Sequence, residues 1–225
     1  MEKLIISMIG ENLHGRVLSS FLNKNGIIHK CIIEKGTSRS KKREQWLKPN
    51  DKSFSIESEI LFVKNIEGDS VIEIYNDFDG YIINGGLPIL KKNILDLPKK
   101  GFLNAHPGIL PKYRGQNPVH WSIHNFDPVG ATIHLIDENI DTGPILIKKE
   151  LEKFESTTIN DLRLEVLKFS ASLLVEYLLN INKYPPREQK LQEGNNYPIY
   201  PKKNNIYLEN KLKKIGKLIN KGEKL

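Results

Sequence analysis

Short apolar runs alternate with an amphipathic segment at the start of the chain, and this alternation limits the folds open to it. Residues 3–9 (KLIISMI) form an apolar run that ends at Gly10, and residues 26–33 (GIIHKCII) form a second one. Between them, residues 13–24 (LHGRVLSSFLNK) carry apolar side chains at helical spacing. Strand, helix and strand in this order predict a parallel sheet with right-handed crossovers.

The same alternation continues along the chain. Residues 34–54 are polar and basic, and they predict a surface loop with one or two helical turns between Arg43 and Leu47. Further strands are predicted at 56–64, 79–85, 101–106, 129–136 and 143–150, and further helices at 70–76 and 117–126. We therefore expect an α/β fold with a Rossmann-like, mostly parallel sheet that has helices on both faces.

A change in composition follows the last predicted strand. Ser156 or Thr157 can cap a long helix that runs to about Lys183. The next stretch, YPPREQKLQEGNNYPIYPKK, is rich in proline and turn residues, and YLENKLKKIGKLI resumes helical spacing. We expect a main domain at residues 1–183 and a C-terminal extension at 184–225 with a Pro-rich turn and a basic helix.

Charge and cysteine content exclude several classes of protein. Lys and Arg number 34 against 27 Asp and Glu, a net charge of +7, and residues 201–225 hold eight lysines and two glutamates. Such a tail could bind phosphate, a membrane surface or nucleic acid, but a solvated helix face is favoured because no Arg-rich or aromatic-interleaved pattern accompanies the lysines. Cys31 is the one cysteine, so no disulfide can form within the chain.

Location follows from the same features. No run of about 18 apolar residues could span a bilayer, and the first residues lack the features of a signal peptide. We expect a cytoplasmic protein that does not bind membranes or a specific nucleic acid.

The residues that point to chemistry lie in NAHPGILPKYRG, residues 104–115. Asn104 and His106 are two apart at the end of a predicted strand, so both point to one side. Asp141 lies in a later turn, where a carboxylate brought beside an imidazole would raise its pKa and orient it. These residue types suit acyl transfer, with Asn as oxyanion donor, His as acid or base and Asp as its partner. Without a Ser or Cys nucleophile, the acceptor must supply its own, most simply an amine.

Other polar features favour structural interpretations. His120 and His124 are four apart on a predicted helix, but the glutamate of an HExxH zinc motif is absent, so no metal site is predicted. The segment GENLHGR after the first strand is either a phosphate-binding loop or a plain strand-to-helix turn, and the sequence leaves both open.

From Tyr81 to Glu150 the sequence resembles the folate-dependent formyltransferases, a family that includes glycinamide ribonucleotide transformylase, methionyl-tRNA formyltransferase and sugar-nucleotide amine N-formyltransferases. The shared pattern is Asn104-Ala105-His106, then GILPKYRG, then Asp141-Thr142-Gly143. The resemblance implies a catalytic domain of the formyltransferase fold that moves a formyl group from 10-formyltetrahydrofolate to a primary amine without a metal. It implies that Asn104 stabilises the oxyanion, that His106 transfers the proton and that Asp141 tunes His106.

The resemblance also implies where folate binds. The expected cofactor-binding residues lie in the loop after the 79–85 strand, in the Leu-Pro loop and just past it, and in the DENID turn: Leu87, Ile89, Leu90, Gly108, Ile109, Leu110, Pro111, Gln116, Asp137, Glu138, Asn139 and Ile140. Leu87, Ile89 and Leu110 could instead be core residues.

The acceptor is predicted from the stretch around the Leu-Pro loop. LPKYRG followed by Pro118 and Trp121, and the later NNYPIYPKK, resemble the sugar-nucleotide enzymes, which implies a nucleotide-linked amino sugar for surface polysaccharide, such as a lipopolysaccharide O-antigen. A tRNA enzyme is disfavoured because only about 42 residues follow the long helix. The alternatives are a phosphoribosylglycinamide formyltransferase of purine synthesis, a formyltetrahydrofolate hydrolase, and a non-catalytic binder that uses the basic tail. The tail could also pair two subunits as a homodimer.

Overall fold

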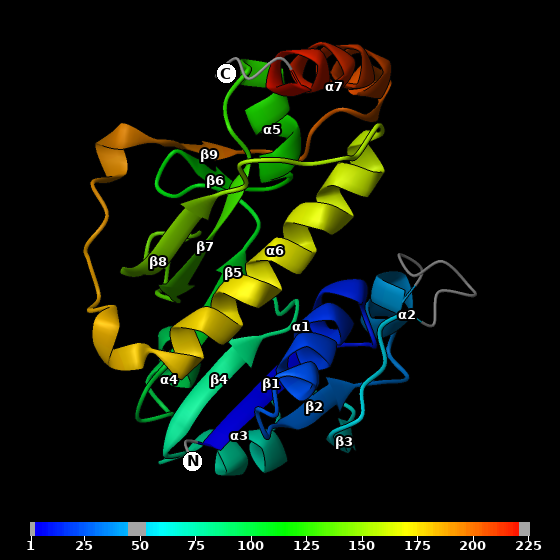
Figure 1. Cartoon of the computed structure of the whole chain (residues 1–225). Coiled ribbons are helices and arrows are strands. Elements are labelled where there is room, and N and C mark those ends of the chain that lie inside the picture. The colour runs from blue at the N-terminus through cyan, green and yellow to red at the C-terminus, as the bar shows by residue number, and fades with distance from the viewer. Residues whose placement is uncertain (1–2, 45–52, 221–225) are drawn as a thin grey trace. The chain divides into compact units, whose positions relative to one another are not determined.

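The structure, a computed structural model, describes residues 3–44 and 53–220 (Figure 1). The chain forms two compact units. The first comprises Met1–Asn104 and Leu135–Asn139, and the second comprises Ala105–His134 and Ile140–Leu225.

The first unit is built on parallel strands. They hydrogen-bond in the order β3-β2-β1-β4-β5, and every pair in this order runs parallel. The strands are β1 (Lys3–Ile9), β2 (Lys30–Glu34), β3 (Glu59–Val63), β4 (Gly80–Asn84) and β5 (Phe102–His106), of which the last ends in the second unit. Figure 1 shows β1, β2 and β4 side by side. The predicted α/β fold with a mostly parallel sheet is confirmed.

Helices cover both faces of this sheet. They are α1 (Leu13–Lys24), α2 (Ser38–Glu44), α3 (Asp69–Tyr75) and α4 (Lys92–Leu95). Ile5 and Ile9 of β1 pack in one apolar cluster with Val71 and Tyr75 of α3. Because successive strand residues point to opposite faces, Met8 faces the other way, where it meets Gly15 of α1. Both faces of β1 are therefore buried, as in a sheet with crossover helices.

The loop after β1 is a strand-to-helix turn. Asn12 caps α1: its side-chain oxygen accepts from the N–H of Gly15, and its Nδ2 donates to the carbonyl oxygens of Ile9 and Gly85. The side chain thereby ties the helix start to the end of β4 and satisfies one of the helix's free N–H groups. Of the two interpretations left open by the sequence, these contacts support the plain turn.

The second unit combines an antiparallel strand pair with packed helices. Its strands are β6 (Tyr113–Gly115), β7 (Gly130–Leu135), β8 (Ile145–Glu150) and β9 (Asn195–Tyr197), where β7 ends in the first unit. β7 and β8 pair antiparallel, and β6 and β9 pair parallel. The strand order places β7 next to β5. Its helices are α5 (Pro118–Asn125), α6 (Ile159–Leu179) and α7 (Asn205–Asn220), with short 3₁₀ turns η1 (Ile181–Lys183), η2 (Leu191–Glu193) and η3 (Lys202–Asn204).

Some predicted boundaries were wrong. The second strand begins at Lys30, because Gly26, with φ +67°, turns the chain after α1. Of the helical turns expected between Arg43 and Leu47, Arg43 and Glu44 belong to α2, which begins at Ser38, and the remaining residues lie outside the described ones. The long helix is capped by Thr158, which accepts from the N–H of Asp161, and it ends at Leu179. The three-residue strands β6 and β9 and the one-turn helix α4 were not predicted.

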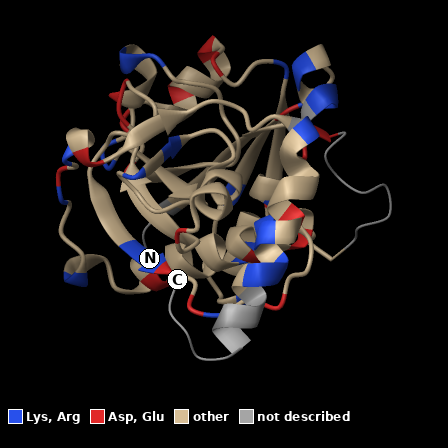
Figure 2. Cartoon of the chain, turned by 90° about the horizontal axis from the view of Figure 1, so that it is seen from above, with Lys and Arg blue, Asp and Glu red and all other residues tan. Residues whose placement is uncertain are grey.

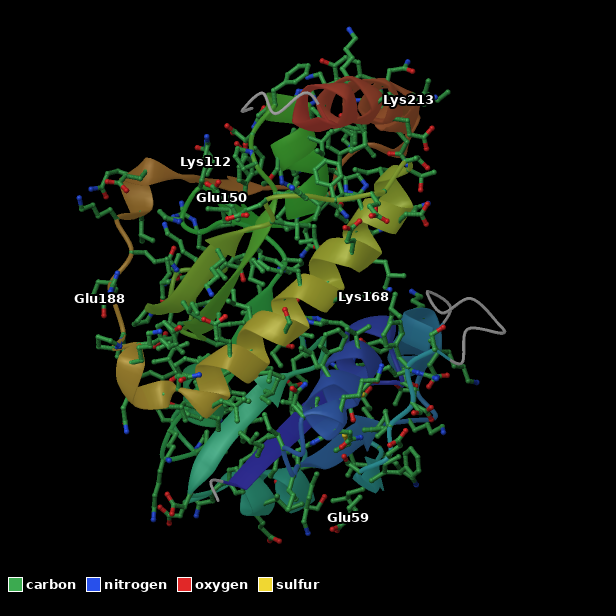
Figure 3. The ribbon with its side chains drawn as sticks, viewed as in Figure 1. Glu59, Lys112, Glu150, Lys168, Glu188 and Lys213 are labelled. Carbon is green, nitrogen blue, oxygen red and sulfur yellow. The ribbon has the colours of Figure 1, made fainter. Side chains whose placement is uncertain are left out.

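The basic C-terminal helix is packed against its neighbours. Leu208, Leu212 and Ile215 of α7 lie in one buried cluster with residues of α5 and α6. Lys211 is also buried, and its Nζ donates to the carbonyl oxygen of His124. Lys213 is exposed, and Figure 3 shows it on the outer side of α7. Figure 2 colours the Lys and Arg positions of the ribbon blue and the Asp and Glu positions red, and both colours occur along the chain.

The described residues contain neither a membrane-spanning helix nor a cluster of metal ligands. None of the helices within residues 3–44 and 53–220 has the length and apolar character needed to cross a membrane. The same residues contain no group of three or more His, Cys, Asp or Glu side chains placed to hold a metal ion.

Candidate active site

Asn104 and His106 lie at the end of β5, as predicted. All five residues of this strand are buried, and His106 is its last residue. Asn104 is 9% exposed and His106 4%. Residues two apart on a strand share one face, so the amide and the imidazole point to the same side of β5.

The structure brings the Asp141 carboxylate to His106. Oδ2 of Asp141 lies 3.5 Å from Nδ1 of His106, and the N–H of Gly115 donates to the same oxygen at 2.9 Å. Asp141 has φ +53°, a left-handed conformation that is uncommon for residues other than glycine. The turn therefore holds an unfavourable backbone conformation at the residue whose carboxylate faces the imidazole.

His134 is a third member of this group that the sequence analysis missed. It lies on β7 and is 1% exposed, and its Nε2 is 3.6 Å from Oδ1 of Asp141. The ring centroids of His106 and His134 are 6.2 Å apart, and the two rings are arranged edge to face. The signal was the position of His134 inside an apolar strand seven residues before Asp141. Only the pairing of β7 beside β5 gives that position its meaning, and spacing alone does not reveal it.

The short strand β6 completes the surroundings of His106. Nε2 of His106 donates to the carbonyl oxygen of Tyr113 at 2.8 Å, and two residues later Gly115 provides the N–H that binds Asp141. One three-residue strand thus supplies a main-chain partner to both His106 and Asp141. The imidazole is held at both nitrogens, with Nδ1 toward the carboxylate.

The electrostatic environment sets the protonation of this group. Burial lowers the pKa of His106, Asp141 opposes that shift, the neighbouring His134 adds to it, and the Tyr113 carbonyl opposes it. Burial alone would raise the pKa of Asp141, but the charge of His106 and the hydrogen bond from His134 outweigh it and hold the pKa well below its usual range. Asp141 is therefore ionised at neutral pH beside an imidazole that loses its proton easily.

Thr132 of β7 holds the Leu-Pro loop between β5 and β6 by two hydrogen bonds. The Thr132 hydroxyl donates to the carbonyl of Gly108 at 2.8 Å and accepts from the N–H of Leu110 at 3.1 Å. Gly108 lies against the imidazole, since a Cβ there would be 2.8 Å from Nε2 of His106. Leu110 is fully buried, as the core alternative for this residue predicted.

The other predicted cofactor-binding residues of the second unit are more open. Ile109 and Pro111 are half-buried in the same loop, and Gln116 and Ile140 are exposed. The main-chain N–H of Gln116 donates to the carbonyl oxygen of Tyr197 on β9. Gly108, Leu110 and Gln116 therefore lie on one short stretch of chain that begins at His106.

The remaining predicted cofactor-binding residues belong to the first unit. Leu87 and Leu90 are buried in its apolar cluster, whereas Ile89 is 65% exposed and is not a core residue. Glu138 forms an ion pair with Lys92 at 3.4 Å. Asp137 accepts from the N–H of Asn139 in the turn after β7. The binding role of these residues stays a prediction.

Known proteins are similar to this chain in sequence and in fold. Residues 24–178 match the sequence profile of the family described as Formyl transferase. A methionyl-tRNA formyltransferase from Halothermothrix orenii is 30% identical over 187 residues, which are 80% of this chain and 59% of that protein. The chain thus spans less than two thirds of the length of this curated relative.

Solved structures have the same fold. A 4-N formyltransferase from Francisella tularensis is 25% identical with a TM-score of 0.62, over 87% of this chain and 76% of that one. The formyltransferase PseJ from Anoxybacillus kamchatkensis, solved with UDP-4,6-dideoxy-4-formamido-L-AltNAc and tetrahydrofolate, is 24% identical with a TM-score of 0.61, over 96% and 98% of the two chains. Because the family profile covers more than half of the sequence, the chain belongs to the formyl transferase family.

Proposed function

We propose that this chain transfers a formyl group from 10-formyltetrahydrofolate to the primary amine of a nucleotide-linked amino sugar. The observation that carries the proposal is the contact of the Asp141 carboxylate with His106 at the end of β5, with Asn104 on the same face of that strand. The residues fit such a co-substrate, because a buried amide, an imidazole and an ionised carboxylate are the groups that a formyl transfer to an amine requires.

The reaction moves one acyl group and one proton. The amine nitrogen bonds to the formyl carbon, the bond from that carbon to N10 of the folate breaks, and a proton passes from the amine to N10. We assign the stabilisation of the developing negative charge on the formyl oxygen to the Asn104 amide. Nδ1 of His106 faces Asp141, so we assign the proton transfer to that nitrogen and the stabilisation of its protonated state to the carboxylate.

The acceptor has to provide the nucleophile. Polar groups that lie against the His106 imidazole include the Asp141 carboxylate, the Tyr113 carbonyl and the His134 ring. The nearby Thr132 hydroxyl is engaged by two main-chain groups. Since none of these is an activated Ser or Cys, a covalent acyl-enzyme is not expected, and direct attack by an amine fits the site.

The proposed folate contacts follow the predictions. We propose that the main chain of residues 108–111, with the loop after β4 and the turn after β7, recognises the donor and acceptor edge of the pterin. The rigid attachment of Gly108 and Leu110 to Thr132 supports this, because a pre-ordered loop loses less entropy on binding.

The acceptor class rests on similarity in length and fold. PseJ, whose complex holds a formamido sugar nucleotide, aligns over nearly the whole of both chains. The sequence similarity to the methionyl-tRNA formyltransferase from Halothermothrix orenii makes methionyl-tRNA the second candidate acceptor. We place the sugar product in surface polysaccharide synthesis and the protein in the cytoplasm.

A test measures tetrahydrofolate release by absorbance, with 10-formyltetrahydrofolate and separate acceptors. The acceptors are nucleotide-linked 4-amino and 3-amino sugars, glycinamide ribonucleotide, methionyl-tRNA and none. Release with an amino sugar alone supports the proposal, and release with another acceptor or with none replaces it by that activity. The His106→Ala variant should lose the activity, whereas Glu188→Gln, a change at an exposed acid, should retain it.

A further inference from the structure

The segment between α6 and α7 contacts the chain on both sides of Asp141. At the β8 side, Arg187 and Ile145 exchange two main-chain hydrogen bonds, each of 2.8 Å. At the β6 side, the N–H of Asn195 donates to the carbonyl oxygen of Lys112. The catalytic turn and β6 are therefore both attached to one segment that follows the long helix.

Gln189 is the side chain of this segment that reaches the Asp141 turn. Its Nε2 donates to the main-chain oxygen of Asp141 at 3.0 Å and to that of Gly143 at 2.6 Å. Its neighbours in sequence, Glu188 and Lys190, are exposed, whereas Gln189 is half-buried. Figure 3 shows Glu188 on the loop between α6 and β9. Both amide hydrogens of Gln189 thus bind the two carbonyls that flank Thr142.

The hydrogen bonds of Gln189 satisfy two carbonyls of the Asp141 turn and leave the side-chain oxygen of Gln189 without a partner among the described residues. Its Oε1 is buried and has no hydrogen-bond partner among the described residues. A buried acceptor without a partner is unfavourable, so the hydrogen bonding of the Gln189 amide itself does not explain the position of this side chain. The residue that these hydrogen bonds stabilise is Asp141, whose left-handed backbone conformation needs support from its surroundings.

The other end of the segment holds β6. The Arg114 guanidinium donates to the carbonyl oxygens of Leu191 and Gly194. Gly194 lies so close to Pro111 that a Cβ there would be 1.8 Å from the Pro111 carbonyl oxygen. Since β6 supplies the Tyr113 carbonyl to His106, the same segment also fixes the second partner of the imidazole.

We propose that Gln189 is a positioning residue of the active site, which acts by holding the turn that aims the Asp141 carboxylate at His106. The inference rests on the proposed function, since it gives Asp141 its role there. Gln189 does not touch the reacting atoms. It limits the movement of Asp141, and a displacement of a catalytic group by about 1 Å can cost on the order of 100-fold in rate.

The test replaces Gln189 with Met, which has a similar size and no donors. The chain of residues 1–225 is labelled at histidine, and the titration of His106 is followed by NMR, a measurement that needs no substrate. Because Asp141 raises the pKa of His106, a carboxylate that drifts away should lower it. We expect this fall in Gln189→Met and a kcat at least about tenfold lower per folded molecule, with a smaller change in KM.

Gln192→Met is the matched control, since Gln192 is exposed in the same segment. It should leave the titration and kcat unchanged. Gln189→Glu, which turns the donors into an ionised acceptor that faces two carbonyls, is the second variant if Gln189→Met folds poorly, and it should lower kcat at least as far.

Two outcomes separate the inference from the proposed function. A merely structural role predicts a lower Tm with the wild-type titration and kcat of the folded fraction, and that result would overturn the positioning role. A wild-type chain that is silent with every acceptor would overturn the proposed function, while the titration would still show whether Gln189 places Asp141.

Discussion

Replacement of Asp141 by Asn removes one buried charge from the site and keeps the shape of the side chain. The lost interaction is that between the carboxylate and a protonated His106, whose nearest atoms are 3.5 Å apart with 5% and 14% of the two side chains exposed. Coulomb's law at this separation gives about 1 kcal/mol in a water-like medium and about 5 kcal/mol at an effective dielectric constant of about 20. The carboxylate favours the protonated imidazole, so the pKa of His106 should fall when this interaction is lost.

The kinetic consequence follows from the protonated fraction of His106. Burial already lowers the pKa of this imidazole, so the protonated form is the minor one at neutral pH. Loss of about 1 kcal/mol or more of this attraction makes the protonated form about 5-fold or more scarcer, and a step that needs that form should slow in proportion. The assays are a pH profile of kcat and an NMR titration of His106 in Asp141→Asn, with Glu188→Gln as the control.

One result would refute this reasoning. If His106 titrates in Asp141→Asn as it does in the wild type while kcat still falls, the carboxylate acts on something other than the charge of the imidazole. The contact between Asp141 and His134 would then be the next interaction to test, with His134→Asn.

Three further changes test the oxyanion donor, the Leu-Pro loop and a buried histidine outside the site. Asn104→Ala should lower kcat by about 100-fold to 1,000-fold, as for other oxyanion donors, with folate affinity little changed by calorimetry, and a near-normal kcat would remove Asn104 from the mechanism. Thr132→Val leaves the Gly108 carbonyl and the Leu110 N–H without their buried partner, so urea unfolding should show a loss of about 2 kcal/mol or more. Burial lowers the pKa of His120 to about 4, so the folded state resists its protonation and stability should fall from pH 6.5 to 4. In His120→Leu, the free energy of unfolding should change less steeply with pH, by an amount that corresponds to about one proton fewer taken up on unfolding. An unchanged pH dependence would contradict the assignment.

The fold and the placement of Asn104 and His106 on one face of a strand could be predicted from the sequence because both depend on local signals. Apolar runs of strand length separated by helical periods indicate crossover units without knowledge of the partners. The placement of Asn104 and His106 on one face follows from strand alternation alone, once β5 is recognised. The turn at Asp141 is likewise visible in its neighbours Thr142 and Gly143.

The parts that were missed depend on contacts between segments distant in sequence. His134 acquires a role only because β7 lies beside β5, and an isolated histidine in an apolar strand gives no sign of that. β6 and β9 have three residues each, too few for any periodicity, yet β6 supplies main-chain groups to His106 and Asp141. Main-chain donors and acceptors are common to every residue, so their role cannot be read from residue type.

The domain boundary predicted at residue 183 falls between the Asp141 turn and two of the groups that hold it. The family profile ends at residue 178, and the Asp141 turn lies inside it. Nevertheless, two attachments of that turn, the Gln189 amide and the Arg187 backbone, come from residues beyond 183. Since Asp141 has an unfavourable backbone conformation, its geometry depends on those attachments. We therefore infer that Gln189 and the Arg187 backbone, which follow the long helix, help to hold the geometry of the site.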